Sequence, residues 1–254
     1  MLFPIGDDDR DLDGPALITW ALLLGNLGVY LLQMLDPTFT YGWSVVPYEI
    51  MTGEDLTGLQ QINIGGQYVD LNHEPGPIPI YLTLISAMFM HGGLMHIGGN
   101  MLYLWIFGDN VEHRFGPKNF LLFYLFSGLI GTFTQIALDP DSIIPNLGAS
   151  GAISGVLGAY LVLFPRNRVH VIFFIRVIAL PAIGVIGVWA AFQIINGLGS
   201  FAMAEQAGGV AYGAHIGGFI AGAAIALLMR KKSRERDSVI TRVAQRDPRS
   251  KTLW

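Results

Sequence analysis

The chain has 254 residues, of which 52% are hydrophobic and 13% are charged, and its formal net charge is −4 at pH 7. Soluble globular domains carry about 25% charged residues, so the composition excludes an ordinary soluble domain and favours an integral membrane protein. The lack of cysteine excludes disulfide bonds, thiolate catalysis and cysteine-ligated metals.

The first 14 residues form a polar, acidic leader that includes the run Asp7-Asp8-Asp9. No short apolar core followed by a small-residue cleavage site is present, so we expect no cleavable signal peptide. The first apolar stretch is expected to act as its own insertion signal, and residues 1–14 are expected to lie in the cytoplasm.

Six apolar stretches follow, each long enough or nearly so to cross about 30 Å of hydrocarbon as a helix. They lie at about residues 15–35, 79–107, 119–138, 150–165, 173–196 and 211–229. The fourth falls short of the ~20 residues that a span needs, which suggests a helix that begins below the membrane surface inside a bundle. The predicted fold is an all-α membrane domain of six helices over residues 15–229, followed by a basic tail at 230–254.

Basic residues occupy alternate connections between these stretches. Arg10 precedes the first, two basic residues follow the second, three arginines lie around the connection from the fourth to the fifth, and nine Lys or Arg follow the sixth. The positive-inside rule therefore predicts a multi-pass protein of the cell membrane with both termini in the cytoplasm. The connections without basic residues are then external: 36–78, 139–147 and 197–210.

The basic tail is expected to lie near anionic lipid headgroups. No aromatic platform accompanies its charge, so binding of nucleic acid is not indicated.

The long external connection at 36–78 contains Trp43 and the tyrosines Tyr41 and Tyr48 among apolar residues. Trp and Tyr favour the interface between headgroups and acyl chains, so this connection is expected to lie partly in the membrane. A disordered external loop is the alternative, because long connections are usually either functional or disordered.

The second stretch carries His91, His96 and Asn100 in an environment where polar groups are costly and usually mark function. His96 and Asn100 are four residues apart and share a helix face, and an Asn amide is a neutral donor suited to an oxyanion. A zinc site is disfavoured, because the spacing of the two histidines and the lack of a nearby acidic residue differ from His-Glu-x-x-His. Structural hydrogen bonding between helices is the alternative.

The fourth stretch opens with Gly148-Ala149-Ser150-Gly151. Ser150 could cap the helix by accepting a hydrogen bond from an amide of the first turn. Alternatively, it is a nucleophile, since the free amides at a helix start suit an oxyanion. The glycines Gly148 and Gly151 would leave room for a substrate backbone.

Small residues recur at three- or four-residue intervals on the fourth and sixth stretches. They are Gly151, Gly155 and Gly158 on one, and Ala214, Gly218 and Gly222 on the other. Such spacing lets helix backbones approach closely in lipid, so we expect these two helices to touch.

His215 lies beside the small-residue stripe of the sixth stretch and is the candidate base for Ser150. Imidazole titrates near neutrality and can take and return a proton. No Asp or Glu lies in this stretch, so we infer a dyad without an acidic third member. A buried neutral histidine bonded to a carbonyl is the alternative.

Three motifs thus occur in order on the second, fourth and sixth stretches: His-x-x-x-x-His-x-x-x-Asn, Gly-x-Ser-Gly and Ala-His-x-x-Gly-x-x-x-Gly. Together they resemble the rhomboid family of intramembrane serine proteases, over nearly the whole membrane domain. Glu112-His113-Arg114 is similar to the family's Glu-x-Arg, a structural pair that holds the adjacent loop.

The resemblance implies that Ser150 is the nucleophile and His215 the general base. It implies an oxyanion site made of Asn100, His96 and the Ser150 backbone amide, with His91 organising the first external connection. The implied fold is a six-helix bundle whose site opens to the external side in a water-filled depression, without a cofactor or metal.

Two positions depart from the family pattern. Ser154 replaces an aromatic residue that stacks on the catalytic imidazole in many members, and it could form a hydrogen bond instead. Leu82-Thr83 replaces a Trp-Arg pair that anchors the first loop.

The predicted function is that of a serine endopeptidase cleaving a peptide bond in or near a transmembrane segment of membrane-protein substrates. One alternative is a catalytically inactive relative that binds and escorts membrane proteins. A second is a small channel or transporter, although no paired broken helices or internal repeat support it.

Overall fold

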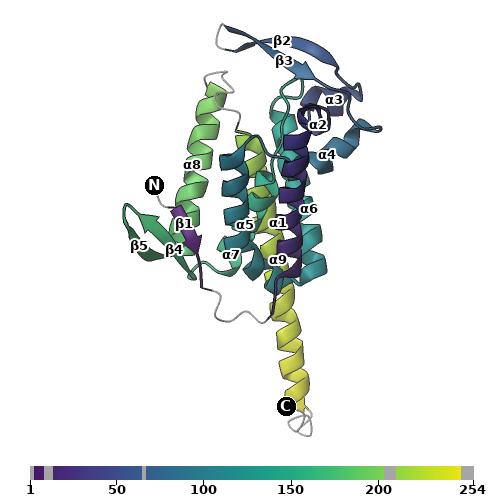
Figure 1. Cartoon of the computed structure of the whole chain (residues 1–254). Coiled ribbons are helices and arrows are strands. Elements are labelled where there is room, and N and C mark those ends of the chain that lie inside the picture. The colour runs from purple at the N-terminus through teal and green to yellow at the C-terminus, as the bar shows by residue number, and fades with distance from the viewer. Residues whose placement is uncertain (1–2, 9–13, 65–66, 203–209, 247–254) are drawn as a thin grey trace.

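The computed structural model describes residues 3–8, 14–64, 67–202 and 210–246. Long helices dominate it, and they pack side by side around a shorter central one (Figure 1). The long helices are α1 (Leu17–Leu35), α5 (Leu94–Phe115), α6 (Pro117–Leu138), α8 (Ala182–Ala202) and α9 (Tyr212–Arg246), and the short one is α7 (Ser150–Leu163).

Helix α7 forms the centre of the bundle. Every residue from Gly151 to Tyr160 is buried, and the helix packs against α5, α6 and α9. Its sequence is apolar with small residues on several sides, which is the pattern of a helix enclosed by neighbours. A helix of 14 residues is too short to cross the hydrocarbon by itself, as its sequence indicates.

The prediction of membrane-spanning helices is confirmed in its main features. Within the described residues, four helices are long and apolar enough to cross a membrane, or five if a bent pair is one span. Many of their large apolar side chains are exposed, such as Trp20 on α1 and Trp105 on α5, each 53% exposed. Exposed apolar surface of this extent suits contact with lipid.

The second predicted stretch, 79–107, is not one continuous helix. Its first part is a string of short turns: η1 (Ile80–Leu82), α4 (Thr83–Ser86) and η2 (Ala87–Phe89). The chain then bends by 76° before α5 begins at Leu94. Gly92 and Gly93 lie at the break, where the low helix propensity of glycine favours an interruption.

The fifth predicted stretch, 173–196, also needs correction, because its first residues form strands. The hairpin of β4 (Arg168–Phe173) and β5 (Arg176–Pro181) precedes α8. Val169 and Val171 alternate with exposed residues and are fully buried, which is the period of a strand with one covered face. This alternation lies just before the predicted stretch, which begins at the last residue of β4, so the apolar residues of the turn and of β5 were counted into the helix.

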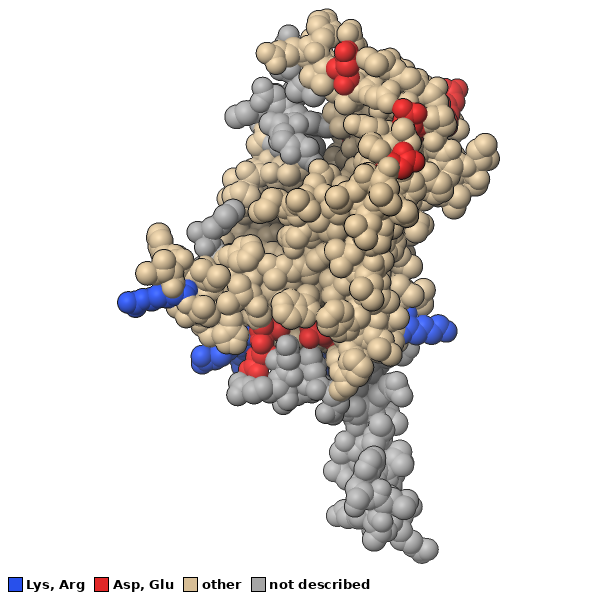
Figure 2. Space-filling view, in the orientation of Figure 1, with Lys and Arg blue, Asp and Glu red and all other residues tan. Residues whose placement is uncertain are grey.

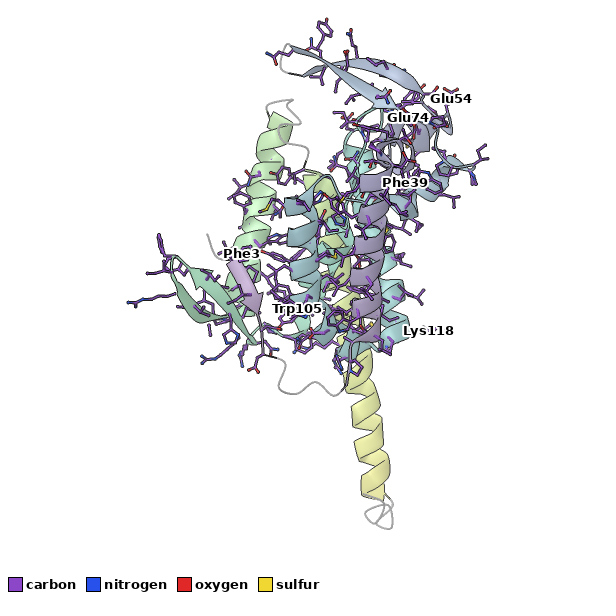
Figure 3. All side chains as sticks on the ribbon, in the orientation of Figure 1. Phe3, Phe39, Glu54, Glu74, Trp105 and Lys118 are labelled. Atoms are coloured by element: carbon purple, nitrogen blue, oxygen red, sulfur yellow. The ribbon has the colours of Figure 1, made fainter. Side chains whose placement is uncertain are left out.

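The N-terminal leader contributes to this sheet. Strand β1 (Phe3–Gly6) pairs antiparallel with β4, with Phe3 opposite Ile172, and the strand order is β1-β4-β5. Phe3 accordingly lies beside the β4–β5 hairpin (Figure 3). Residues 9–13 of the predicted leader lie outside the described residues.

The connection 36–78 is folded over the residues that the structure describes. It contains α2 (Pro37–Trp43), α3 (Pro47–Thr52) and the antiparallel hairpin of β2 (Gly58–Ile64) and β3 (Gln67–His73). Val45 and Asn146 exchange backbone hydrogen bonds of 2.9 and 2.7 Å, and the Tyr48 N–H donates to Ser142 O at 3.0 Å. These contacts hold the connection against the segment that precedes α7. The alternative of a disordered loop therefore does not match the described residues of this connection.

Two acidic groups, the buried Glu112 and the half-buried Asp7, join the N-terminal segment to the C-terminal part of α5. Glu112 of α5 accepts hydrogen bonds from Ile18 N (2.9 Å), Thr19 N (2.7 Å) and Thr19 Oγ1 (2.8 Å) at the start of α1. Asp7 Oδ2 accepts from Asn110 Nδ2 at 3.0 Å and from the Tyr160 hydroxyl of α7. Glu112 thus holds α1, whereas Arg114 is exposed.

Charge is distributed unevenly along the molecule. Glu54 and Glu74 lie on the first connection, at the end opposite Lys118 (Figure 3). In the view of Figure 2, the Lys and Arg residues drawn in blue all lie near the end from which α9 protrudes. Helix α9 continues past the predicted start of the tail at 230, and residues 247–254 lie outside the described residues.

Candidate active site

Ser150 is the first residue of α7, directly after a turn that requires glycine. Gly148 has φ +138° and its N–H donates to Ala87 O at 2.8 Å. A Cβ at Gly148 would stand 3.1 Å from the His96 imidazole and 3.4 Å from Ser150 Oγ. Ala149 occupies the N-cap position and the helix has no side-chain cap, so the capping alternative for Ser150 does not match the structure.

Ser150 and His215 lie together although α7 and α9 are far apart in sequence. Ser150 Oγ is 2.7 Å from His215 Nε2. The two helices approach at their small residues, as the spacing predicted: a Cβ at Gly218 would stand 2.0 Å from Gly151 O. Another Cβ, at Gly222, would stand 2.0 Å from Gly155 O.

The other ring nitrogen of His215 faces an amide that the sequence reasoning missed. His215 Nδ1 is 2.8 Å from Gln193 Oε1 on α8, and the Gln193 side chain is buried. The Trp189 ring, one turn earlier on α8, lies 6.3 Å from the imidazole, and the Tyr212 ring lies 6.4 Å from it, centroid to centroid. The imidazole is therefore contacted by one amide and two aromatic rings.

His96 and Asn100 of α5 present donor groups near Ser150. His96 Nδ1 accepts the Gly92 N–H at 3.2 Å, so the neutral imidazole carries its proton on Nε2. That atom is the one beside Gly148. Asn100 Nδ2 is buried and has no hydrogen-bond partner among the described residues.

His91 lies at the bend before α5, and its backbone hydrogen bonds are to Gln33. Its backbone is clamped by Gln33 of α1, whose Oε1 accepts the His91 N–H at 2.9 Å and whose Nε2 donates to His91 O at 3.1 Å. Its buried ring packs edge-on against His96, with centroids 5.1 Å apart. Its position links α1 to the His96 side of the site.

The two departures from the family pattern form local hydrogen bonds. Ser154 is buried and donates to Ser150 O at 2.6 Å, which stabilises the first turn of α7. The aromatic rings beside the His215 imidazole are those of Trp189 and Tyr212. Thr83 donates to Ile80 O at 2.7 Å, which stabilises the turn that begins α4.

A cavity of about 940 Å³ lies beside these groups. Its lining includes Leu94 and Met95, which are 73% and 91% exposed, so the cavity reaches the molecular surface at the start of α5. Polar and aromatic side chains from four helices also line it: His96, Asn100, Tyr103, Ser150, Ser154, Trp189 and His215. Its size is within the range of sites that bind organic ligands.

A second cavity, of about 30 Å³, also touches Ser150. Small and apolar residues line most of it, including Ala87, Gly128 and Ala152. Gln135 also lines it, and its buried Oε1 has no hydrogen-bond partner within the described ranges. It has room for about one water molecule or a very small side chain. Among the described residues, no three His, Asp or Glu side chains gather as a metal site would require.

Comparison with known proteins agrees with these motifs. The Rhomboid domain family matches residues 80–232. Rhomboid protein 1, mitochondrial, of Saccharomyces cerevisiae is 34% identical over 56% of this chain, and Rhomboid protease GluP of Bacillus subtilis is 37% identical over 57%. RHOMBOID-like protein 12, mitochondrial, of Arabidopsis thaliana is 27% identical over 91% of the chain.

The matched regions span 40%, 26% and 62% of these three relatives, respectively. The family match itself covers more than half of the present chain and includes the segments that carry His96, Ser150 and His215. The chain belongs to the rhomboid family.

Proposed function

We propose that the chain is an intramembrane serine endopeptidase that cleaves a peptide bond in or near a transmembrane segment of another membrane protein. The observation that carries the proposal is the 2.7 Å contact between Ser150 Oγ and His215 Nε2 at the edge of the large cavity. A hydroxyl beside a base, with access for a polypeptide, is the arrangement that acyl transfer needs. The name of the Bacillus subtilis relative, a rhomboid protease, supports the same reaction class.

In the proposed mechanism, Ser150 Oγ attacks the substrate carbonyl carbon while His215 Nε2 takes the hydroxyl proton. The imidazolium then gives this proton to the leaving amine as the C–N bond breaks, which leaves an acyl-enzyme on Ser150. A water molecule next loses a proton to His215, attacks the ester and releases the acid. Ser150 recovers its proton from His215, so the cycle uses no cofactor.

The negative oxygen of each tetrahedral intermediate needs hydrogen-bond donors. We assign this role to His96 Nε2–H, to Asn100 Nδ2 and to the Ser150 backbone N–H. Asn100 Nδ2 is buried and has no partner in the described part of the chain, which suits a donor that is used only in the transition state. The Ser150 amide is at the start of α7, where backbone N–H groups lack helical partners.

The proposed substrate presents an extended segment to the cavity. A peptide bond within a helix is shielded by its own hydrogen bonds, so the substrate helix must unwind near the cleaved bond. The small second cavity at Ser150 favours a small side chain there, and helix-weakening residues beyond it would lower the cost of unwinding.

We propose that the membrane domain at 15–229 spans the membrane six times. This count takes α7 as one span and the bent pair as another, with the connection 36–78 partly embedded on the external side. The charge distribution of the sequence favours cytoplasmic termini in a cell membrane, and the active site would then open externally.

Purified full-length chain should cleave a model single-span substrate in proteoliposomes. Ser150→Ala and His215→Ala should each abolish turnover, and Asn100→Ala should raise the barrier by about 2.7–4 kcal/mol. A fluorophosphonate should label the wild type at Ser150, and mass spectrometry would locate the adduct. Cleavage that persists in both Ser150→Ala and His215→Ala would disprove the assignment.

Labelling also separates the proposal from its alternatives. An inactive escort protein would bind the substrate without capture of the fluorophosphonate. A channel would instead release solute from liposomes that contain no substrate.

A further inference from the structure

The proposed base has a second hydrogen-bond contact whose chemistry bears on its function. His215 uses Nε2 toward Ser150 at 2.7 Å and Nδ1 toward Gln193 Oε1 at 2.8 Å. The Gln193 side chain is 8% exposed, so its amide oxygen is largely shielded from water. Polar side chains in spanning helices are costly and usually have a function.

The tautomer of the imidazole decides whether His215 can act as a base. For the Ser150 hydroxyl to donate to Nε2, that nitrogen must be unprotonated, and the neutral ring must carry its proton on Nδ1. Which nitrogen is protonated depends on the hydrogen bond that the other one makes. An acceptor opposite Nδ1 selects the productive tautomer, and Gln193 Oε1 is at that position.

We propose that Gln193 is a positioning residue that accepts the Nδ1–H hydrogen bond of His215 and so fixes its tautomer and ring orientation. This inference rests on the proposed function. It replaces a pure Ser-His dyad by a chain of three groups, Ser150, His215 and Gln193. The third member is neutral and takes no proton at any step.

The neighbours of Gln193 support a positioning role for α8. Trp189 and Gln193 are four residues apart and share a helix face, and both contact the imidazole of His215. Ser154 of α7 is occupied by its hydrogen bond to Ser150 O. The imidazole is therefore oriented mainly from α8 and from its own helix, through Tyr212.

A neutral acceptor also differs chemically from a carboxylate in this position. An ionised carboxylate would place an unpaired charge inside the bundle, which is expensive. The amide oxygen supplies the acceptor without a net charge, which suits a site enclosed by apolar helices.

Kinetics of the full-length enzyme in proteoliposomes provide the first test. Gln193→Leu, which keeps the approximate size but removes the acceptor, should lower kcat about tenfold with KM unchanged. Gln193→Glu, with its carboxyl group neutral, keeps a carbonyl oxygen as acceptor and should recover most of this loss. Asn196→Leu is the matched control. It removes a side-chain amide from the same helix, but that amide donates to Phe192 O within α8, at 2.7 Å.

The test distinguishes failure of the role of Gln193 from failure of the proposed function. A wild type that neither cleaves substrate nor captures a fluorophosphonate would overturn the proposed function itself. An active wild type whose kcat changes less than about twofold in Gln193→Leu would overturn only the role of Gln193. An equal loss in Asn196→Leu would also overturn it, since the effect would then belong to the helix as a whole.

Nitrogen-15 NMR of histidine-labelled wild type gives a test that does not depend on a variant of Gln193. At a pH where the ring is neutral, the His215 signals, assigned by their loss in His215→Asn, should show the proton on Nδ1. Gln193→Leu should move that proton toward Nε2. A wild-type spectrum with the proton on Nε2 would contradict the proposal directly.

Discussion

At the scale of single residues, Glu49 is the group outside the spanning helices whose protonation should affect stability most. The side chain is 4% exposed, and its Oε1 accepts the Leu56 N–H at 3.0 Å. Burial raises the pKa of Glu49 to about 7, the Leu56 N–H opposes the rise, and nearby Asp55 adds to it. In the unfolded chain the pKa returns toward 4.5.

The folded state therefore holds a proton between about pH 4.5 and 7 that the unfolded state has lost. The stabilisation from this proton is complete below the lower value and is lost as the pH rises through the upper one. Glu49→Gln should match the wild type at low pH and exceed it at pH 8 by about 2 kcal/mol. Thermal unfolding in detergent micelles measures this, with the exposed Glu54→Gln as control. The prediction fails if Glu49→Gln keeps the wild-type dependence on pH.

Sequence motifs indicated most residues of the candidate site and missed one for a physical reason. His96 and His215 stood out because imidazole groups are unusual in apolar stretches, and Ser150 because it lies between glycines at the start of a helix. Gln193 was missed because the search for a third member considered only acids, and an amide carries no charge. A polar residue one turn after Trp189 in a spanning helix was the available signal.

At the scale of elements, the approach of α7 and α9 sets the geometry of the site. The backbones touch at glycines, and a Cβ at Gly218 would stand 2.0 Å from Gly151 O, one residue after Ser150. Backbone atoms cannot move aside as a flexible side chain can. Any added side chain must therefore displace α9, and with it His215, which is three residues before Gly218.

Gly218→Ala should consequently destabilise the bundle by about 1–3 kcal/mol and lower substrate cleavage. Gly184→Ala on α8 is the matched control, because a Cβ there would meet nothing within 4 Å. Unfolding in mixed detergent micelles and cleavage of the model substrate are measured side by side. Equal behaviour of the two variants would show that the close approach of α7 and α9 does not hold the site together.

The elements that the sequence predicted well are those with uniform apolar composition. The first, third, fourth and sixth stretches begin within two residues of α1, α6, α7 and α9. The second and fifth stretches were wrong in their first parts, because hydropathy alone does not reveal a helix break or a strand. Gly92-Gly93 mark the break before α5. The alternating burial of Val169 and Val171, just before the fifth stretch, marks the strand that pairs with β5.

At the scale of the whole molecule, the basic residues gather toward one end of the bundle. Acidic side chains lie at both ends in Figure 2, whereas Lys and Arg side chains lie only toward the end opposite α2, α3 and the β2–β3 hairpin in that view. Retention of basic segments on the cytoplasmic side is what orients membrane helices. The basic residues of the folded molecule thus lie at the end that the sequence predicts to be cytoplasmic.

The lack of native cysteine allows this orientation to be tested with single thiols. Asp70→Cys on β3 and Lys118→Cys on α6 place one thiol toward each end of the bundle, at exposed positions (Figure 1, Figure 3). A membrane-impermeant maleimide applied to intact cells should label Asp70→Cys alone, and both variants after permeabilisation. The reverse pattern would mean that the protein has the opposite orientation, with the cavity near Ser150 open to the cytoplasm. Substrates would then be cleaved from the cytoplasmic side, which contradicts the orientation predicted from the charge distribution.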